Sequence, residues 1–288
     1  MIHVIDTCHQ IKGLFDNGAF NYPRWEAYIN SIYNNSAHIF KDEADEYINS
    51  GLYTFEKDFL PVINAVYENP KLKLLQESFT AVTDNLNQRI TEKFGKCVTT
   101  DIVLYLGLCN AAGKVTRING IDTILLGIEK ILELNWYNLD SMYGLIYHEL
   151  GHMYHSQHGI LEQESNDNKK NFVWQLFTEG TAMYFEQALI GDFHYYHQDV
   201  NGWREWCDAH FTQILLDFDR ELPVMTRLEQ RYFGDWCNYY GYSDTGYYLG
   251  SRFVQYLTGI YKFDDIINLK IDAVYDLYRE FVTIRGDI

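Results

Sequence analysis

The sequence predicts an α+β protein that is mostly helical. Apolar residues recur every three or four positions over much of the chain, which is the pattern of helices that bury one face. A stretch rich in β-branched and aromatic residues, at roughly 98–129, interrupts that pattern, and helical periodicity returns after it. We expect one domain over 1–288, with a helical region at 1–96, a small sheet and two central helices at 97–191, and a helical region at 192–288.

The N-terminal region is expected to be helical from about Asn21 to Phe94. Its clearest periodic run has apolar side chains three or four positions apart, at Leu72, Leu75, Phe79, Val82 and Leu86.

The segment 98–129 predicts a small antiparallel or mixed sheet. Residues 99–107 have the β-branched and aromatic composition of a strand. Residues 115–118 lead into Asn119-Gly120, a dipeptide that favours a two-residue hairpin turn, and 121–128 supplies the returning strand.

Helices are expected again beyond the sheet. Residues 139–157 form one helix, with Asn138 or Asp140 at its N-cap, and a polar loop follows it at 159–170. A second helix covers about 172–190 and ends at Gly191. Further helical periodicity lies near 204–221, 245–261 and 272–284.

Composition and charge exclude several classes of protein. Of the 288 residues, 47% are hydrophobic and 22% are charged, so general disorder is excluded. Asp and Glu number 40 against 23 Lys and Arg, which gives a net charge of −17. A chain this acidic repels phosphate, so we expect neither nucleic acid nor a membrane as a partner.

The chain is expected to be cytoplasmic. Its first residues carry no basic segment followed by an apolar run, and no uncharged apolar stretch is long enough to span a bilayer. The five cysteines are scattered and never form a C-x-x-C pair, which favours reduced thiols over a disulfide framework.

The segment from His148 to His152, with the sequence H-E-L-G-H, is typical of a metal site. Two histidines four positions apart project from one face of a helix and can bind the same ion. Glu149 lies beside the first histidine, where it can act as a general base on a water molecule. The alternative is a pair of ordinary helix histidines with no metal.

A catalytic zinc ion usually has three protein ligands, and two residues compete for the third place. His158 has the histidine spacing of the metzincins, but His155 stands where that arrangement needs a glycine to turn the chain. An unbroken helix would therefore carry His158 away from the ion. Glu179 lies on the second central helix, where Gly180 and Ala182 allow close packing, and we expect it to be the third ligand.

The H-E-L-G-H segment, taken together with T-E-G-T-A-M-Y-F-E at 178–186, resembles the gluzincins, which are zinc metallopeptidases. The resemblance covers about 125–190 and implies a zincin-like fold, with a small sheet beside the helix that carries the active site. It also implies one zinc ion held by His148, His152 and Glu179, with Glu149 as general base. Two departures are the 26 residues between His152 and Glu179 and an exopeptidase motif reduced to Gly127-Ile128-Glu129.

The resemblance also implies further parts of a peptidase site. The strand at 123–128 is either a sheet edge that pairs with an extended peptide or protein substrate or an ordinary buried strand. Tyr247 is the first candidate to stabilise the oxyanion of the reaction, and Tyr248 is the second. The alternative for either tyrosine is a role in the core or at the surface. His155 is expected to lie near the site without binding the ion, while His194 and His197 are expected to lie in a loop.

We therefore expect a zinc-dependent peptidase. One alternative is a non-catalytic zinc-binding regulatory protein on the same scaffold, and another is a helical interaction protein whose H-E-L-G-H segment is coincidental. The substrate, the choice between endopeptidase and exopeptidase action, and the oligomeric state are left open.

Overall fold

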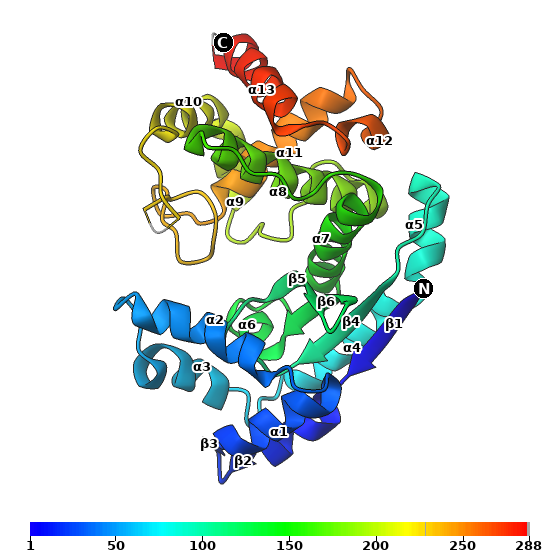
Figure 1. Cartoon of the computed structure of the whole chain (residues 1–288), viewed down its shortest axis with the longest axis vertical. Coiled ribbons are helices and arrows are strands. Elements are labelled where there is room, and N and C mark those ends of the chain that lie inside the picture. Colours follow the sequence, from blue (N-terminus) through cyan, green and yellow to red (C-terminus); the bar gives the residue numbers. More distant parts are fainter. Residues whose placement is uncertain (228, 287–288) are drawn as a thin grey trace. The chain divides into compact units, whose positions relative to one another are not determined.

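The computed structural model describes residues 1–227 and 229–286, which fold as two compact units, Met1–Glu149 and Leu150–Ile288 (Figure 1). The division falls inside helix α7 (Leu139–His158). The protein is α+β and mostly helical with a small sheet, which confirms the predicted class.

The sheet of the first unit is mixed. Its strand order is β1-β4-β6-β5, and these strands span Ile2–Asp6, Thr100–Tyr105, Ile121–Gly127 and Gly113–Ile118 respectively. Strand β4 pairs in parallel with both β1 and β6, whereas β5 runs antiparallel to β6. A separate short hairpin joins β2 (Phe15–Asp16) to β3 (Ala19–Phe20).

The strand order decides between the alternatives for the sheet. The sheet is mixed, because β4 pairs in parallel both with β6 and with β1, which was not expected as a strand. The strand containing 123–128 is β6, which lies between β4 and β5, so the expectation of an edge is wrong and the strand lies inside the sheet. The edge beside β6 is β5, because the hairpin folds β5 back along the outer side of β6.

The hairpin between β5 and β6 has the expected turn. Ile118 pairs with Ile121 across Asn119 and Gly120, whose φ angles are 50° and 82°. Positive φ at both central residues defines the type I′ turn, which Asn-Gly adopts readily and which matches the twist of the two strands.

The helices of the first unit surround this sheet. They are a 3₁₀ helix at Cys8–Leu14, α1 (Tyr22–Ile32), α2 (Ala37–Asn49), a π-helical turn at Phe55–Phe59, α3 (Leu60–Asn64), α4 (Leu72–Thr83), α5 (Leu86–Phe94) and α6 (Ile128–Glu133). Their apolar faces and both faces of β4 and β6 form the core, so Ile102, Val103 and Ile124 have no exposed surface.

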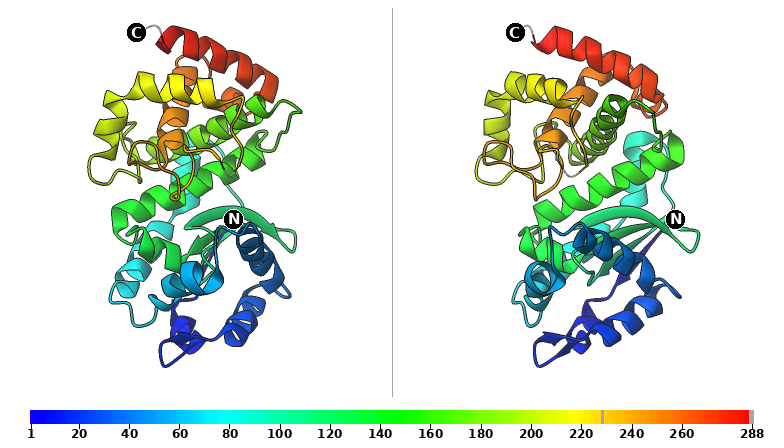
Figure 2. Two further views of the ribbon diagram at one scale, coloured as in Figure 1. Left: turned by 90° about the vertical axis from the view of Figure 1, so that its left-hand side faces the viewer. Right: turned by 60° about the vertical axis from the view of Figure 1, so that its left-hand side comes forward.

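The second unit is helical. Its helices are α8 (Asn168–Ile190), α9 (Trp203–Ala209), α10 (Phe211–Glu221), α11 (Thr245–Thr258), α12 (Phe263–Ile266) and α13 (Ile271–Gly286) (Figure 2). Helix α8 ends as expected at Gly191, which has a φ of 86°. The single helix expected near 204–221 is two helices, because the backbone of His210 leaves the helical region, with φ −114° and ψ 18°. The His210 ring stacks on Trp206, and its Nδ1 donates to the Trp206 carbonyl oxygen.

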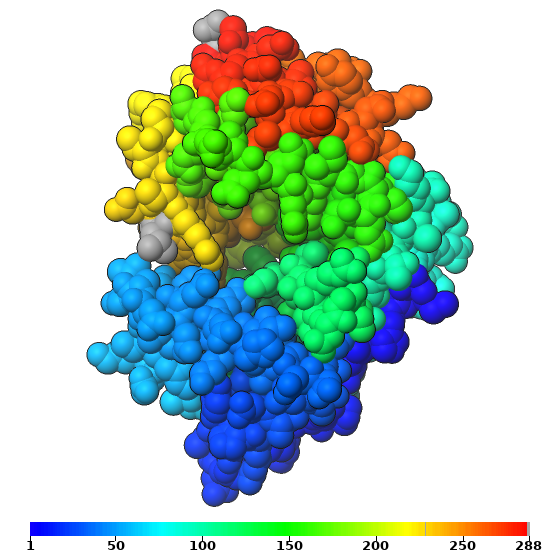
Figure 3. Space-filling view, in the orientation of Figure 1, coloured from blue at the N-terminus to red at the C-terminus, as the bar shows by residue number. Residues whose placement is uncertain are grey.

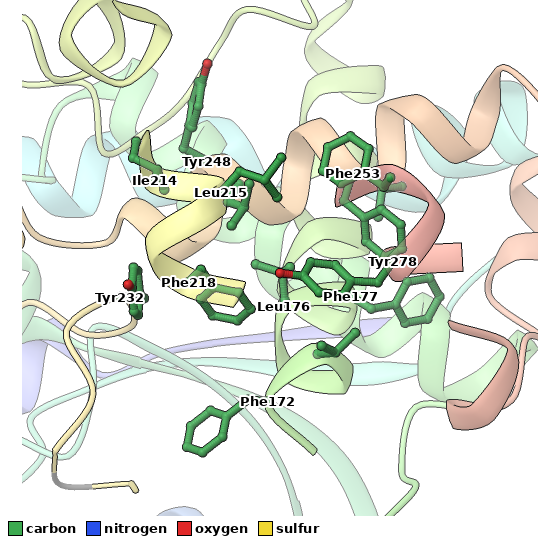
Figure 4. Packing of buried hydrophobic residues seen from close by; sticks show 14 of the residues in the cluster. Phe172, Leu176, Phe177, Ile214, Leu215, Phe218, Tyr232, Tyr248, Phe253 and Tyr278 are labelled. Atoms are coloured by element: carbon green, nitrogen blue, oxygen red, sulfur yellow. The ribbon is translucent and has the colours of Figure 1, made fainter. Parts of the chain in front are cut away.

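The core of the second unit is built around α8. Buried aromatic and aliphatic side chains from α8, α10, α11 and α13 interlock, among them Phe177, Phe218, Phe253 and Tyr278 (Figure 4). No helix within the described part of the chain is long and apolar enough to cross a membrane.

Candidate metal centre

Helix α7 carries both histidines of the H-E-L-G-H segment on one face. Asn138 caps it, with its side-chain oxygen accepting a hydrogen bond from the Ser141 amide at 3.0 Å, as one of the two expected capping residues. The helix continues unbroken to its end at His158. His148 is buried, and the His152 side chain is 14% exposed, so both lie where an ion would be largely shielded from water.

Glu179 reaches His152 because α7 and α8 pack closely. A side chain at Gly151 would place its Cβ 2.8 Å from the Cα of Ala182, so only glycine permits this approach. The result is a distance of 3.2 Å between Nε2 of His152 and Oε2 of Glu179. Glycine in α7 and alanine in α8 therefore set the position of the carboxylate.

His148, His152 and Glu179 together form a group that fits a metal ion. One donor atom from each of the three side chains lies within 4.8 Å of the other two. Two ligands bound at about 2.1 Å with tetrahedral geometry are separated by about 3.4 Å, which is close to the distance between His152 and Glu179. Two imidazole nitrogens and one carboxylate oxygen are a donor set that suits catalytic zinc.

Glu149 lies against the edge strand of the sheet. Its side chain is buried, and a Cβ at Gly113 of β5 would lie only 2.4 Å from Oε1 of Glu149. Leu145 of α7 closes the same space, because its Cδ1 would lie 2.8 Å from that Cβ. Gly113 was not among the residues expected at the site; the run of small residues at Ala111-Ala112-Gly113 is the signal in the sequence that could have indicated it.

Every second residue of strand β5 points its amide and carbonyl groups away from β6. The Gly127 amide donates to the Ala112 carbonyl oxygen at 3.0 Å, which makes Ala112 and Gly127 a hydrogen-bonded pair. Because such pairs alternate along an antiparallel ladder, the amide and carbonyl groups of Gly113, Val115 and Arg117 point outward from the sheet. The hairpin that carries them lies at the surface of the first unit (Figure 3).

The other histidines of α7 have separate contacts. The His158 ring packs on the Tyr154 ring with centroids 4.6 Å apart, and His158 is outside the metal-binding group. His155 is fully buried, and its Nδ1 donates to the hydroxyl of Thr181, two residues after Glu179, at 3.0 Å. Burial, together with the nearby His152, lowers the pKa of His155 to about 3. His155 therefore holds α8 in place as a neutral ring.

The two tyrosines considered for the oxyanion have different surroundings. The Tyr248 hydroxyl donates to Asp208 at 2.7 Å, and its ring is buried in the core of the second unit. The Tyr247 ring packs edge-on against Phe233 with centroids 5.9 Å apart. The role of Tyr247 stays a prediction, whereas the hydroxyl of Tyr248 is already engaged.

The remaining expectations concern loop histidines and the reduced exopeptidase motif. His194 is exposed, whereas His197 is buried with its Nδ1 3.0 Å from the Glu186 carboxylate. The Glu129 carboxylate is buried and accepts backbone hydrogen bonds from Gly107 and Cys109. Burial raises the pKa of Glu129. Glu129 thus fixes the loop after β4, and its carboxylate is not presented to a substrate.

No protein-family model, curated protein or solved structure matches this chain.

Proposed function

We propose that this protein is a zinc-dependent metallopeptidase of the gluzincin type, with a zincin-like fold. The observation that carries the proposal is the convergence of His148, His152 and Glu179, with Glu149 one residue from the first ligand. The spacing of the two histidines and the gluzincin resemblance favour this set, and the close packing of α7 on α8 supports it.

Each residue of the site has its own role in the proposed reaction. His148 and His152 would hold zinc through ring nitrogens, and Glu179 through a carboxylate oxygen. A bound zinc ion lowers the pKa of water and polarises a carbonyl group. The Glu149 carboxylate accepts a proton from the attacking water and delivers it to the leaving amine. Tyr247 is our proposed donor to the oxyanion.

We propose that the substrate is a peptide or protein segment that pairs with β5. The outward backbone groups of Gly113, Val115 and Arg117 can form a ladder with an extended chain. Glu149 lies against the first of these residues, so a chain paired there would pass beside the general base. The scattered cysteines support a cytoplasmic location for this activity.

Substitution of the general base tests the proposal. Glu149→Gln should retain zinc and lower the rate of peptide hydrolysis by about 10²–10⁴-fold, because it removes proton transfer and leaves the ligands in place. Zinc content is measured on the purified protein and turnover on a peptide library with and without chelator. Glu46→Gln, at an exposed position on α2, is the matched control and should not change either value.

The same measurements separate the alternatives. A non-catalytic zinc protein would contain zinc and show no chelator-sensitive cleavage, and a coincidental H-E-L-G-H segment would leave the protein without zinc. The contact of Glu149 with the edge strand favours catalysis, since a purely structural ion needs no base there. Unchanged hydrolysis by Glu149→Gln would overturn the assignment.

A further inference from the structure

The second unit contains a cavity that the proposed peptidase site does not use. It has a volume of about 250 Å³ and lies among α10, α11 and α13. Its lining includes the aromatic rings of Phe211, Tyr256 and Phe281 and the side chains of Arg252 and Arg285. It is smaller than the pockets of about 300–1,000 Å³ that hold drug-sized ligands.

Three aromatic rings form the apolar side of the cavity. The Phe281 ring lies 5.3 Å from the Tyr256 ring and 6.1 Å from the Phe211 ring, measured between centroids, and is tilted by 43° and 70° to them. Phe281 is buried, whereas Phe211 and Tyr256 are partly exposed, so these two rings supply most of the accessible apolar surface. A ligand with a small apolar body can contact them.

The charged lining is positive. The Arg252 guanidinium lies 5.7 Å from the centre of the Phe211 ring, and its closest carboxylate, Asp208, is 3.7 Å away, beyond hydrogen-bond distance. Asp208 is itself shared, because it also accepts a hydrogen bond from Tyr248 and forms an ion pair with Arg204. The charge of Arg252 is therefore only partly balanced.

Arg285 is exposed and has no acidic side chain within 4.0 Å in the part of the chain that the structure describes. Three other arginines of this unit each have such a partner, namely Arg220, Arg231 and Arg279. Acidic residues outnumber basic ones by 40 to 23 in the whole chain, so a cavity with two under-balanced guanidinium groups reverses the local charge.

We propose that this cavity binds a small organic anion, with a compact apolar or aromatic body and one carboxylate or phosphate group. The aromatic rings contact the apolar body of the ligand. Arg252 and Arg285 take the acid group, since guanidinium forms strong paired hydrogen bonds with carboxylate and phosphate.

Four probes test each part of the proposal on the full-length protein. Benzoate and phenyl phosphate carry both the ring and the charge, benzyl alcohol carries the ring alone, and inorganic phosphate carries the charge alone. Binding is measured by calorimetry and by ligand-observed NMR at low and high salt. We expect saturable binding of at least one of the two aromatic anions, weaker binding of the other two probes, and loss of affinity as salt rises.

The Arg285→Gln variant tests whether the aromatic anion binds in this cavity. It should weaken binding of the aromatic anion by about tenfold, because a charge-assisted hydrogen bond is lost. Arg285 is exposed and makes no ion pair with any of the residues 1–227 and 229–286, so its replacement should leave the fold intact, which circular dichroism checks. Arg227→Gln is the matched control, since Arg227 is exposed in the same unit and outside the cavity lining, and it should not change the affinity.

Three results would overturn the proposal: no saturable binding of either aromatic anion, equal loss of affinity in Arg285→Gln and Arg227→Gln, or inorganic phosphate binding as tightly as phenyl phosphate. None of these depends on zinc or peptide hydrolysis. Failure here is therefore distinguishable from failure of the proposed peptidase function.

Discussion

Glu179 can bind the same ion as His152 without any change in the backbone, whereas His158 could do so only if helix α7 were broken. Glu179 comes from a separate helix and already lies 3.2 Å from His152, whereas His158 ends the same helix as His152 and packs on Tyr154. At about 1.5 Å of rise per residue, six residues carry His158 about 9 Å along the axis. A metal ion held by His152 is out of its reach.

We predict that Glu179→Ala lowers zinc affinity by at least about tenfold, because it removes one of three protein ligands. His158→Ala should leave zinc affinity nearly unchanged. Competitive titration of both variants with a zinc-binding dye provides the comparison. The reverse ranking would show that the helix opens near His155 in solution and would move the protein to the metzincin side.

Gly113 is the residue that makes room for the Glu149 carboxylate. Gly113→Ala would place a methyl group 2.4 Å from Oε1 of Glu149, so the carboxylate must move. We predict a loss of about tenfold or more in peptidase turnover with unchanged zinc content, because the base is displaced and the ligands are not. Turnover and metal content are measured on the same preparation.

Thr116→Ala is the control for the Gly113 variant. Thr116 lies on the same strand, three residues on, so its side chain projects to the opposite face of the sheet. An equal loss of turnover in both variants would mean that damage to the strand, and not displacement of Glu149, is the cause.

Residue-scale prediction from the sequence succeeded where chemistry and helical spacing are local. His148 and His152 share a face because they are four apart in one helix, and Asn138 caps that helix through its own side chain. The places of Gly113 and Gly151 were not predictable, because each depends on which backbone packs against it. Whether a position requires glycine can be judged only when the backbone that packs against it is known.

At the scale of elements, local signals again predicted more than long-range pairing. The Asn119-Gly120 turn and the end of α8 at Gly191 follow from short sequence patterns. The order of the strands does not, because β1 pairs with β4 across nearly a hundred residues of chain, and β6 lies inside the sheet only because β4 pairs with its other side. The parallel pairing of β4 and β6 is likewise non-local.

Helices α8 and α11 meet at two glycines. A Cβ at Gly180 would lie 2.2 Å from the Gly250 carbonyl oxygen, and a Cβ at Gly250 would lie 2.4 Å from the Leu176 carbonyl oxygen. These neighbours are backbone atoms, which cannot move without separating the helices. Glu179 is the residue next to Gly180, so the contact also supports the position of the proposed ligand.

We predict that Gly180→Ala destabilises the protein by about 1–3 kcal/mol, as overpacking of a tight interface does. Glycine to alanine in a helix with free space would instead stabilise it by about 0.5–1 kcal/mol, so the sign is diagnostic. Denaturant unfolding measures the difference. Gly13→Ala, whose Cβ meets nothing within 4 Å, is the control, and equal stability changes in the two variants would contradict the packing argument.

At the scale of the whole molecule, the net charge of −17 affects encounter with substrates. We predict that a cationic peptide has a higher kcat/KM than an anionic peptide with the same cleavable segment at low salt, because the protein's field attracts it. The ratio should approach one as ionic strength rises and the Debye length falls from about 30 Å at 0.01 M to about 8 Å at 0.15 M. A ratio that does not change with salt would place any preference in direct contacts.

The glycine contact between α8 and α11 also limits how this sequence can evolve. Gly180 and Gly250 are far apart in the chain, yet a larger residue at either one pushes against backbone belonging to the other helix. A substitution at one site cannot be rescued by shrinking the other, because neither has a side chain left to lose. Larger residues are therefore disfavoured at both positions. We expect a distant relative with the same helix packing to keep this glycine pair together with the two histidines and the glutamate.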